Sequence, residues 1–262
     1  MGGDDLDSDD DYLTEQVADV AETSALREAA VAESKKRKLE DTKSSAAAVE
    51  EDEPSSKKNK PFAKMLLEAG RNLDTQTTEQ QAAFLSTALN HQTLLATNEE
   101  FPEKKLVPHH FRASLKETLL ERLREGISVK RMKKWKNTKS PCVVVLCISA
   151  RRAVAILKEL SGMKVRIAKL FAKHMDIEQQ RDQLRTSPFG LAVGTPNRLR
   201  ALCESGDLSF AHTQLVVMDV AISHKAFTVC TLPDTAPDCM ALLKDFAVPQ
   251  LQQRKDIRMA FF

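Results

Sequence analysis

Residues 190–222 read GLAVGTPNRLRALCESGDLSFAHTQLVVMDVAI, and this stretch decides the fold. Its order is a short apolar strand, a tight turn, a helix, a loop and a second buried strand that ends in Asp219. Thr195 is expected to cap the helix, and Pro196 suits its first turn. The stretch is therefore predicted to form half of a parallel α/β domain.

The turn before this helix offers groups that bind phosphate. A helix start leaves backbone N–H groups without partners, and Arg198 adds a guanidinium that can donate two hydrogen bonds. In the alternative interpretation, the Thr-Pro pair only starts a helix. Asp219 stands at the carboxyl end of its strand, where ligands of open α/β sheets bind.

The α/β pattern extends from Pro141 to the end of the chain. The run CVVVLCI is continuous and apolar, which is typical of a strand that is buried on both faces. Further strands are expected at 165–171, 191–193, 215–218 and 257–262, with helices between them. The pattern predicts about five parallel strands in a three-layer α/β sandwich.

Between Pro61 and Arg124 the apolar residues have helical spacing. We expect one helix that Gly70 ends, a second with a Thr78 and Gln81 capping box, and a third after Pro108. The third helix would carry an apolar stripe made of Phe111, Leu115, Leu119 and Leu123. These helices are expected to pack on the α/β domain or to contact a partner. The neighbouring His109 and His110 would face different ways on a helix, which favours a structural role over a metal site.

Charge is divided unevenly along the 262 residues. Residues 1–60 hold 9 Lys and Arg against 17 Asp and Glu, whereas the remainder holds 30 against 20. The first 60 residues have too few large apolar side chains to offset the entropy of ordering, so they are predicted to be a disordered tail. Ser8 precedes three aspartates and is a candidate site for an acidophilic kinase. A basic body suits a partner with a polyanionic backbone.

Two basic clusters in this tail have the composition of a nuclear import signal. Their members are Lys35, Lys36, Arg37, Lys38, Lys57, Lys58 and Lys60. The alternative is a solvated run of charge without a partner.

Residues 128–139 combine six basic residues with the chain's single tryptophan. Cations that neutralise phosphates, beside an aromatic ring that stacks on an unpaired base, indicate RNA binding. The candidate residues are Lys130, Arg131, Lys133, Lys134, Trp135 and Lys136. In the alternative, the segment is a solvated loop and Trp135 packs into the core.

The five cysteines form no CxxC pair, and several lie in apolar runs. They are expected to be reduced core thiols of an intracellular protein rather than a zinc site or a disulfide framework. No apolar run has the length of a membrane span, and the acidic start lacks the features of a signal peptide. We therefore expect a soluble, unsecreted protein without a metal, a cofactor or a small-molecule substrate.

Three segments, CVVVLCISARRAVAIL, GLAVGTPNRL and QLVVMDVAI, resemble the first RecA-like domain of DEAD-box RNA helicases. The resemblance implies a degenerate domain over 61–262, which begins with the helical extension and contains a single RecA-like, P-loop NTPase-type parallel sheet. It also implies that two motifs hold the RNA backbone. The residues concerned are Arg151, Arg152, Thr195, Asn197 and Arg198.

The sequence departs from the helicase motifs at the positions that bind ATP and activate water. No GxxxxGK occurs, so the backbone cradle and lysine for ATP phosphates are missing. Val220 stands where the helicases have the glutamate that activates water, and Ile222 replaces their last aspartate. Asp219 alone is not expected to organise magnesium and water. The interpretation is a degenerate domain without enzymatic activity.

Residues 169–174, KLFAKH, together with VGTPNRL and the short carboxyl-terminal strand, resemble the Cms-one ribosomal small subunit homologue family. This resemblance implies a nucleolar factor of the small-subunit pre-ribosome, with pre-ribosomal RNA and proteins as partners. Two alternatives stay open: a module that binds proteins without touching RNA, and an active helicase. Retained binding to pre-ribosomal proteins without RNA binding would indicate the first, and ATP hydrolysis lost on changing Asp219 would indicate the second.

Overall fold

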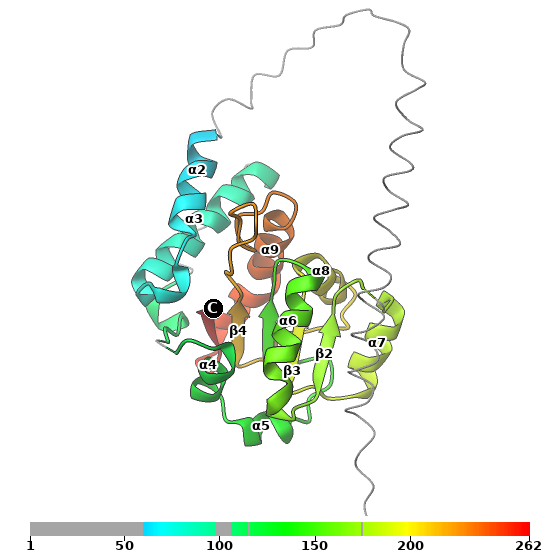
Figure 1. Cartoon of the computed structure of the whole chain (residues 1–262). Coiled ribbons are helices and arrows are strands. Elements are labelled where there is room, and N and C mark those ends of the chain that lie inside the picture. The colour runs from blue at the N-terminus through cyan, green and yellow to red at the C-terminus, as the bar shows by residue number, and fades with distance from the viewer. Residues whose placement is uncertain (1–59, 98–105, 115, 174) are drawn as a thin grey trace, which may run out of the picture. The chain divides into compact units, whose positions relative to one another are not determined.

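A computed structural model of the chain describes residues 60–97, 106–114, 116–173 and 175–262. Their five strands form one sheet in which every neighbouring pair is parallel, in the order β2-β3-β1-β4-β5 (Figure 1). The strands are β1 (Val143–Leu146), β2 (Ile167–Leu170), β3 (Leu191–Gly194), β4 (Leu215–Met218) and β5 (Arg258–Phe261). Each overlaps its predicted range, so the predicted parallel sheet is confirmed.

β1 is the central strand, and its four side chains are fully buried. Its first residue, Val143, lies opposite Leu191 of β3 and Leu215 of β4. Because successive side chains of a strand point to opposite faces, Val144 packs in one hydrophobic cluster and Val145 in the other. This explains why the run is apolar without alternation.

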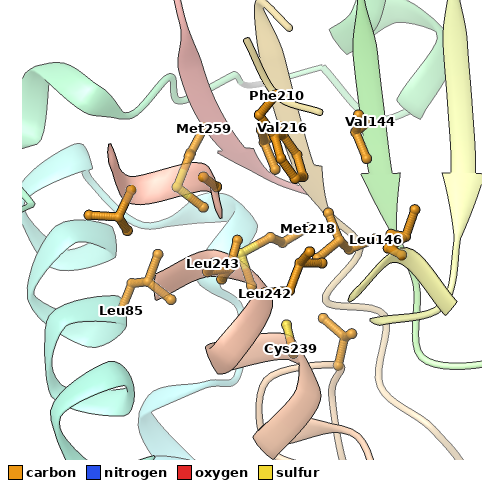
Figure 2. Packing of buried hydrophobic residues seen from close by; sticks show 14 of the residues in the cluster. Leu85, Val144, Leu146, Phe210, Val216, Met218, Cys239, Leu242, Leu243 and Met259 are labelled. Atoms are coloured by element: carbon orange, nitrogen blue, oxygen red, sulfur yellow. The ribbon is translucent and has the colours of Figure 1, made fainter. Parts of the chain in front are cut away.

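Helices cover both faces of the sheet. One layer holds α4 (Leu119–Gly126), α5 (Val129–Lys133) and α6 (Ala150–Leu160), which is followed by η4 (Ser161–Met163). The other holds α3 (Thr78–Thr97), α7 (Ile177–Thr186), α8 (Pro196–Glu204), α9 (Ala236–Leu242), η5 (Leu243–Ala247) and α10 (Val248–Gln253). Figure 2 shows Leu242 and Leu243 between the strands and the helix that carries Leu85. The sheet is thus the middle of three layers.

The first helices differ from the prediction at their caps. α2 (Lys60–Ala69) ends before Gly70 as expected, and η1 (Leu73–Thr75) follows it. The capping box lies one residue earlier than predicted: Thr77 Oγ1 accepts from the N–H of Gln80, and Gln80 Oε1 accepts from the N–H of Thr77. Gln81 is instead buried, and its amide donates to the carbonyl of Leu73 (2.8 Å).

The single helix predicted after Pro108 is wrong. The structure has a short 3-10 helix, η3 (Pro108–His110), and the next helix, α4, begins only at Leu119. Phe111 forms a parallel bridge with Met259 of β5, and its ring stacks on that of Phe261 at 6.0 Å. These contacts with a strand far along the chain override the helical spacing of the apolar residues.

Two other expectations concern the described residues. All five cysteines are free and buried, as predicted. No helix in these residues is both long enough and apolar enough to cross a membrane. The predicted tail, Ser8 and the two basic clusters lie outside the described residues, apart from Lys60 at the start of α2.

Candidate nucleic-acid interface

The turns after β1 and β3 lie side by side at the carboxyl end of the sheet. The N–H of Cys147 donates to the carbonyl of Gly194 (3.0 Å), which joins the two turns. Ser149 then caps α6, because its side-chain oxygen accepts from the N–H of Arg152 (3.2 Å). The turns that carry Arg151 and Arg198 therefore share one edge, as the parallel topology predicts.

The two arginines at the start of α6 have different environments. Arg151 is exposed. Arg152 turns inward, where its Nε and Nη2 donate to the two carboxylate oxygens of Asp219 at 2.8 and 2.7 Å. The Asp219 side chain is fully buried, whereas that of Arg152 is 29% exposed. One N–H on each carboxylate oxygen is the fork geometry of an ionised Arg-carboxylate pair.

Burial and the pairing with Arg152 have opposite effects on the pKa of Asp219. Burial raises the pKa of its carboxyl, and the hydrogen bonds from Arg152 oppose that rise. Those bonds also raise the pKa of Arg152, which stays charged. The carboxylate is thus occupied by a cation of the chain itself. Sequence reasoning missed this pairing and assigned Arg152 to RNA together with Arg151.

Cys147, at the same edge, has no features of a nucleophile. Burial raises the pKa of its thiol to about 12, with a further contribution from Asp219. A thiol with such a pKa carries almost no thiolate at neutral pH. The Cys147 thiol is therefore not a candidate nucleophile at this edge.

Thr195 stands at the N-cap of α8, but its side chain does not cap the helix. Its Oγ1 is hydrogen-bonded to Oδ1 of Asn197 (2.9 Å) instead, so the predicted capping bond is wrong. Pro196 occupies the first turn as predicted. Asn197 is exposed, because its position on the first turn faces away from the buried Leu199.

Arg198 lies beside a second element that the sequence did not point to. Its Nη1 donates to Oε1 of Gln180 (3.1 Å), which belongs to α7. The buried Gln180 amide in turn donates to the carbonyls of Lys169 (2.9 Å) in β2 and of Phe171 (3.0 Å), which directly follows β2. An open groove next to these residues is lined by Ala172, Met175, Asp176, Ile177, Asn197, Arg198 and Ala201. Arg198 is therefore held with its guanidinium at a groove that faces solvent.

The basic segment does not join this edge. Met132 of α5 lies against Gly190, where β3 begins, so the segment lies at the amino end of the sheet. In Figure 1, α5 is at the lower end of the strands and α9 is at the upper end. Residues 130–136 therefore do not share a surface with Arg151 and Arg198. The topological reason is that the segment leads into β1 and does not fold back.

Trp135 is half-buried and packs against the hydrophobic cluster under α6. Its indole N–H donates to the carbonyl of Ser140 (2.7 Å). The alternative in which Trp135 packs into the core thus describes its position better than an open stacking platform. The five cations around it, Lys130, Arg131, Lys133, Lys134 and Lys136, are all exposed.

The two neighbouring histidines of η3 differ in their exposure, because His109 is exposed and His110 is buried. Within the described ranges, no group of three or more His, Cys, Asp or Glu side chains is placed to hold a metal ion. His110 is buried, and its Nδ1 accepts from the N–H of Val107 (3.4 Å).

Comparison with known proteins gives one family. The family model described as "CMS1: U3-containing 90S pre-ribosomal complex subunit" matches residues 112–262, which contain all eleven candidate RNA-binding residues. Protein CMSS1 of Xenopus laevis is 34% identical over 89 residues, which are 33% of this chain and 32% of that protein. Protein CMSS1 of Homo sapiens is 31% identical over 93 residues, covering 35% and 33%.

Protein CMS1 of Chaetomium thermophilum is 30% identical over 133 residues, which are 48% of this chain and 53% of that protein. The matched stretches thus span about a third to about a half of these curated relatives.

Proposed function

This chain belongs to the CMS1 family of U3-containing 90S pre-ribosomal complex subunits, and from that membership we propose that it is a non-catalytic, RNA-associated assembly factor of the small-subunit pre-ribosome. The chain spans only part of its curated relatives, so the role of the whole protein is part of the proposal. Its partners would be pre-ribosomal RNA and proteins, and its location the nucleus and nucleolus. The tail clusters at 35–38 and 57–60 would supply the import signal.

The observation that carries the non-catalytic part is the pair of Arg152 and Asp219. An NTPase needs an acidic group at this strand end that holds magnesium or orients water. Here both oxygens of the fully buried carboxylate accept from one arginine. With the phosphate loop absent from the sequence, the parallel sheet is best interpreted as a RecA-like domain that has lost its nucleotide site.

The RNA-associated part is supported by side chains close to this buried pair that face solvent. Arg151 is exposed, and Arg198 lies at an open groove beside the exposed Asn197. Side chains of these types bind phosphate oxygens and sugar hydroxyls without reading sequence. We name Arg151, Thr195, Asn197 and Arg198 the carboxyl-edge site.

We expect Arg151→Ala and Arg198→Ala to weaken binding of a labelled single-stranded RNA to the full chain. Each lost phosphate contact should lower the slope of log affinity against log salt by about 0.7 units, alike for all sequences. Fluorescence anisotropy titrations at several salt concentrations measure both quantities. Lys158→Ala is the matched control, because Lys158 is an exposed cation in the last turn of the same helix as Arg151.

Unchanged affinity and slope in both arginine variants would remove the carboxyl-edge site. A wild-type chain that binds no RNA but retains pre-ribosomal proteins would favour the second candidate function, a protein scaffold. One observation supports that candidate: Met65 of α2 and Leu94 and Leu95 of α3 are exposed large apolar side chains.

We also expect that the full chain neither binds ATP at micromolar concentration nor hydrolyses it. The physical reason is that no phosphate cradle exists in the sequence and that Arg152 neutralises Asp219. Isothermal titration calorimetry with ATP and magnesium is the measurement. Heat that fits a micromolar dissociation constant, or hydrolysis that Asp219→Asn abolishes, would restore the helicase alternative.

A further inference from the structure

Seven exposed cations gather at the amino end of the sheet, opposite the carboxyl-edge site. Five come from α5 and the residues after it, and two flank Val165 just before β2. We name this set the amino-edge surface: Lys130, Arg131, Lys133, Lys134, Lys136, Lys164 and Arg166.

Contacts at Gly190 join the two groups of cations. A Cβ built on Gly190 would meet both the carbonyl oxygen of Met132 in α5 and Cγ1 of Val165, the latter at 2.6 Å. Arg166 extends over the ring of Phe189, 5.5 Å from its centroid, and donates to Ser187 Oγ (3.1 Å). The cations around α5 and those before β2 therefore belong to one end of the sheet.

The backbone under these cations is fixed by the core. Met132 is 1% exposed, and the indole of Trp135 packs on the same hydrophobic cluster while donating to Ser140. With these two side chains directed inward, the lysines beside them face solvent. The surface is thus held in place before any ligand binds, which lowers the entropic cost of binding.

The cations of this surface are not neutralised by ion pairs. Within the described part of the chain, none of the seven cations forms an ion pair. Nearby acids are engaged by other residues. Asp207, 1% exposed, pairs with Lys139, Arg181 and Arg185. Hydrogen bonds from Arg254 lower the pKa of Asp256, and the charge of Arg131 lowers it further.

We infer that the amino-edge surface is a second binding site for the RNA backbone, separate from the carboxyl-edge site. Five of its seven members are lysines, which are depleted in protein interfaces but common where phosphates are neutralised. The second site does not require the proposed carboxyl-edge site. Only the consequence, that one molecule holds two RNA segments at opposite ends of its sheet, rests on that proposal.

Distance supports the separation of the two sites. A strand of four residues rises about 13 Å from end to end. The Debye length at physiological ionic strength is about 8 Å, so charges at one end are largely screened from those at the other. Mutations at the two ends should therefore act additively on RNA affinity.

The test uses the full chain with a labelled single-stranded RNA of mixed sequence. In the variant Lys133→Ala/Lys134→Ala/Lys136→Ala, three lost phosphate contacts should lower the salt slope by about 2 units. The control Lys64→Ala/Arg71→Ala/Lys116→Ala removes the same charge at three exposed positions elsewhere and should keep the slope. Equal losses in the two variants would mean that only net charge matters, which overturns the site.

A combined variant then tests independence. If the triple change and Arg151→Ala/Arg198→Ala lower log affinity additively, two sites are present; a combined loss that equals the larger single loss would overturn their separation. If the arginine changes have no effect and the triple change does, the carboxyl-edge site fails and the amino-edge site stands. An unchanged RNA affinity with lost binding to polyglutamate would overturn RNA as the ligand in favour of an acidic protein.

Discussion

Arg152→Ala is expected to lower the free energy of unfolding by about 3–5 kcal/mol, which is the usual cost of removing one partner of a buried ion pair. The substitution leaves the Asp219 carboxylate fully buried without the two N–H groups that it accepts from. Burial already raises the pKa of this carboxyl, and without Arg152 nothing of similar strength opposes that rise. Urea unfolding followed by circular dichroism measures the change.

Arg151→Ala is the matched control, because Arg151 is the adjacent residue on the same helical turn and is exposed. Its effect on stability should stay within about 0.5 kcal/mol. In Arg152→Ala/Asp219→Asn, no charge is left buried, so part of the lost stability should return. If Arg152→Ala lowers the free energy of unfolding no more than Arg151→Ala does, the ion pair does not hold the carboxylate in solution. Asp219 would then not be neutralised at the end of β4.

The strands could be predicted because burial on both faces gives their sequences one simple pattern. A strand buried on both faces by two helical layers needs apolar side chains at every position, as in Val143–Leu146 and Leu215–Met218. The third predicted helix was wrong because its spacing is local information, whereas Phe111 is held by β5. Contacts between residues this distant in sequence leave no periodic signal.

The sequence predicts which edge of the sheet carries the candidate site, but it does not predict which side chains face solvent there. Parallel topology brings the turns with Arg151 and Arg198 to one edge whatever the loops do. Which of the two adjacent arginines turns inward depends on the phase of α6. The buried Ile156 stands four residues after Arg152, on the same helical face, and this spacing was the available signal. The partner, Asp219, lies 67 residues away.

Gly194→Ala is expected to destabilise the protein by about 1–3 kcal/mol, the usual cost of overpacking a core. A Cβ at Gly194 would lie 2.5 Å from the carbonyl oxygen of Leu170 and 2.9 Å from Cδ2 of Leu199. The first of these atoms is backbone in the neighbouring strand, where it accepts from the N–H of Thr195 (3.2 Å). It cannot move aside without disturbing the turn into α8.

Gly162→Ala is the control, because a Cβ there meets nothing within 4 Å. It should stabilise the protein by about 0.4–1 kcal/mol through the unfolded state. Thermal or urea unfolding of both variants gives the comparison. Because Gly194 leads into the turn that carries Thr195 and Arg198, RNA affinity should fall in its variant and not in the control. Equal stability in the two variants would mean that the approach of β2 to this turn is looser than described, and that the carboxyl-edge site is not held in a fixed geometry.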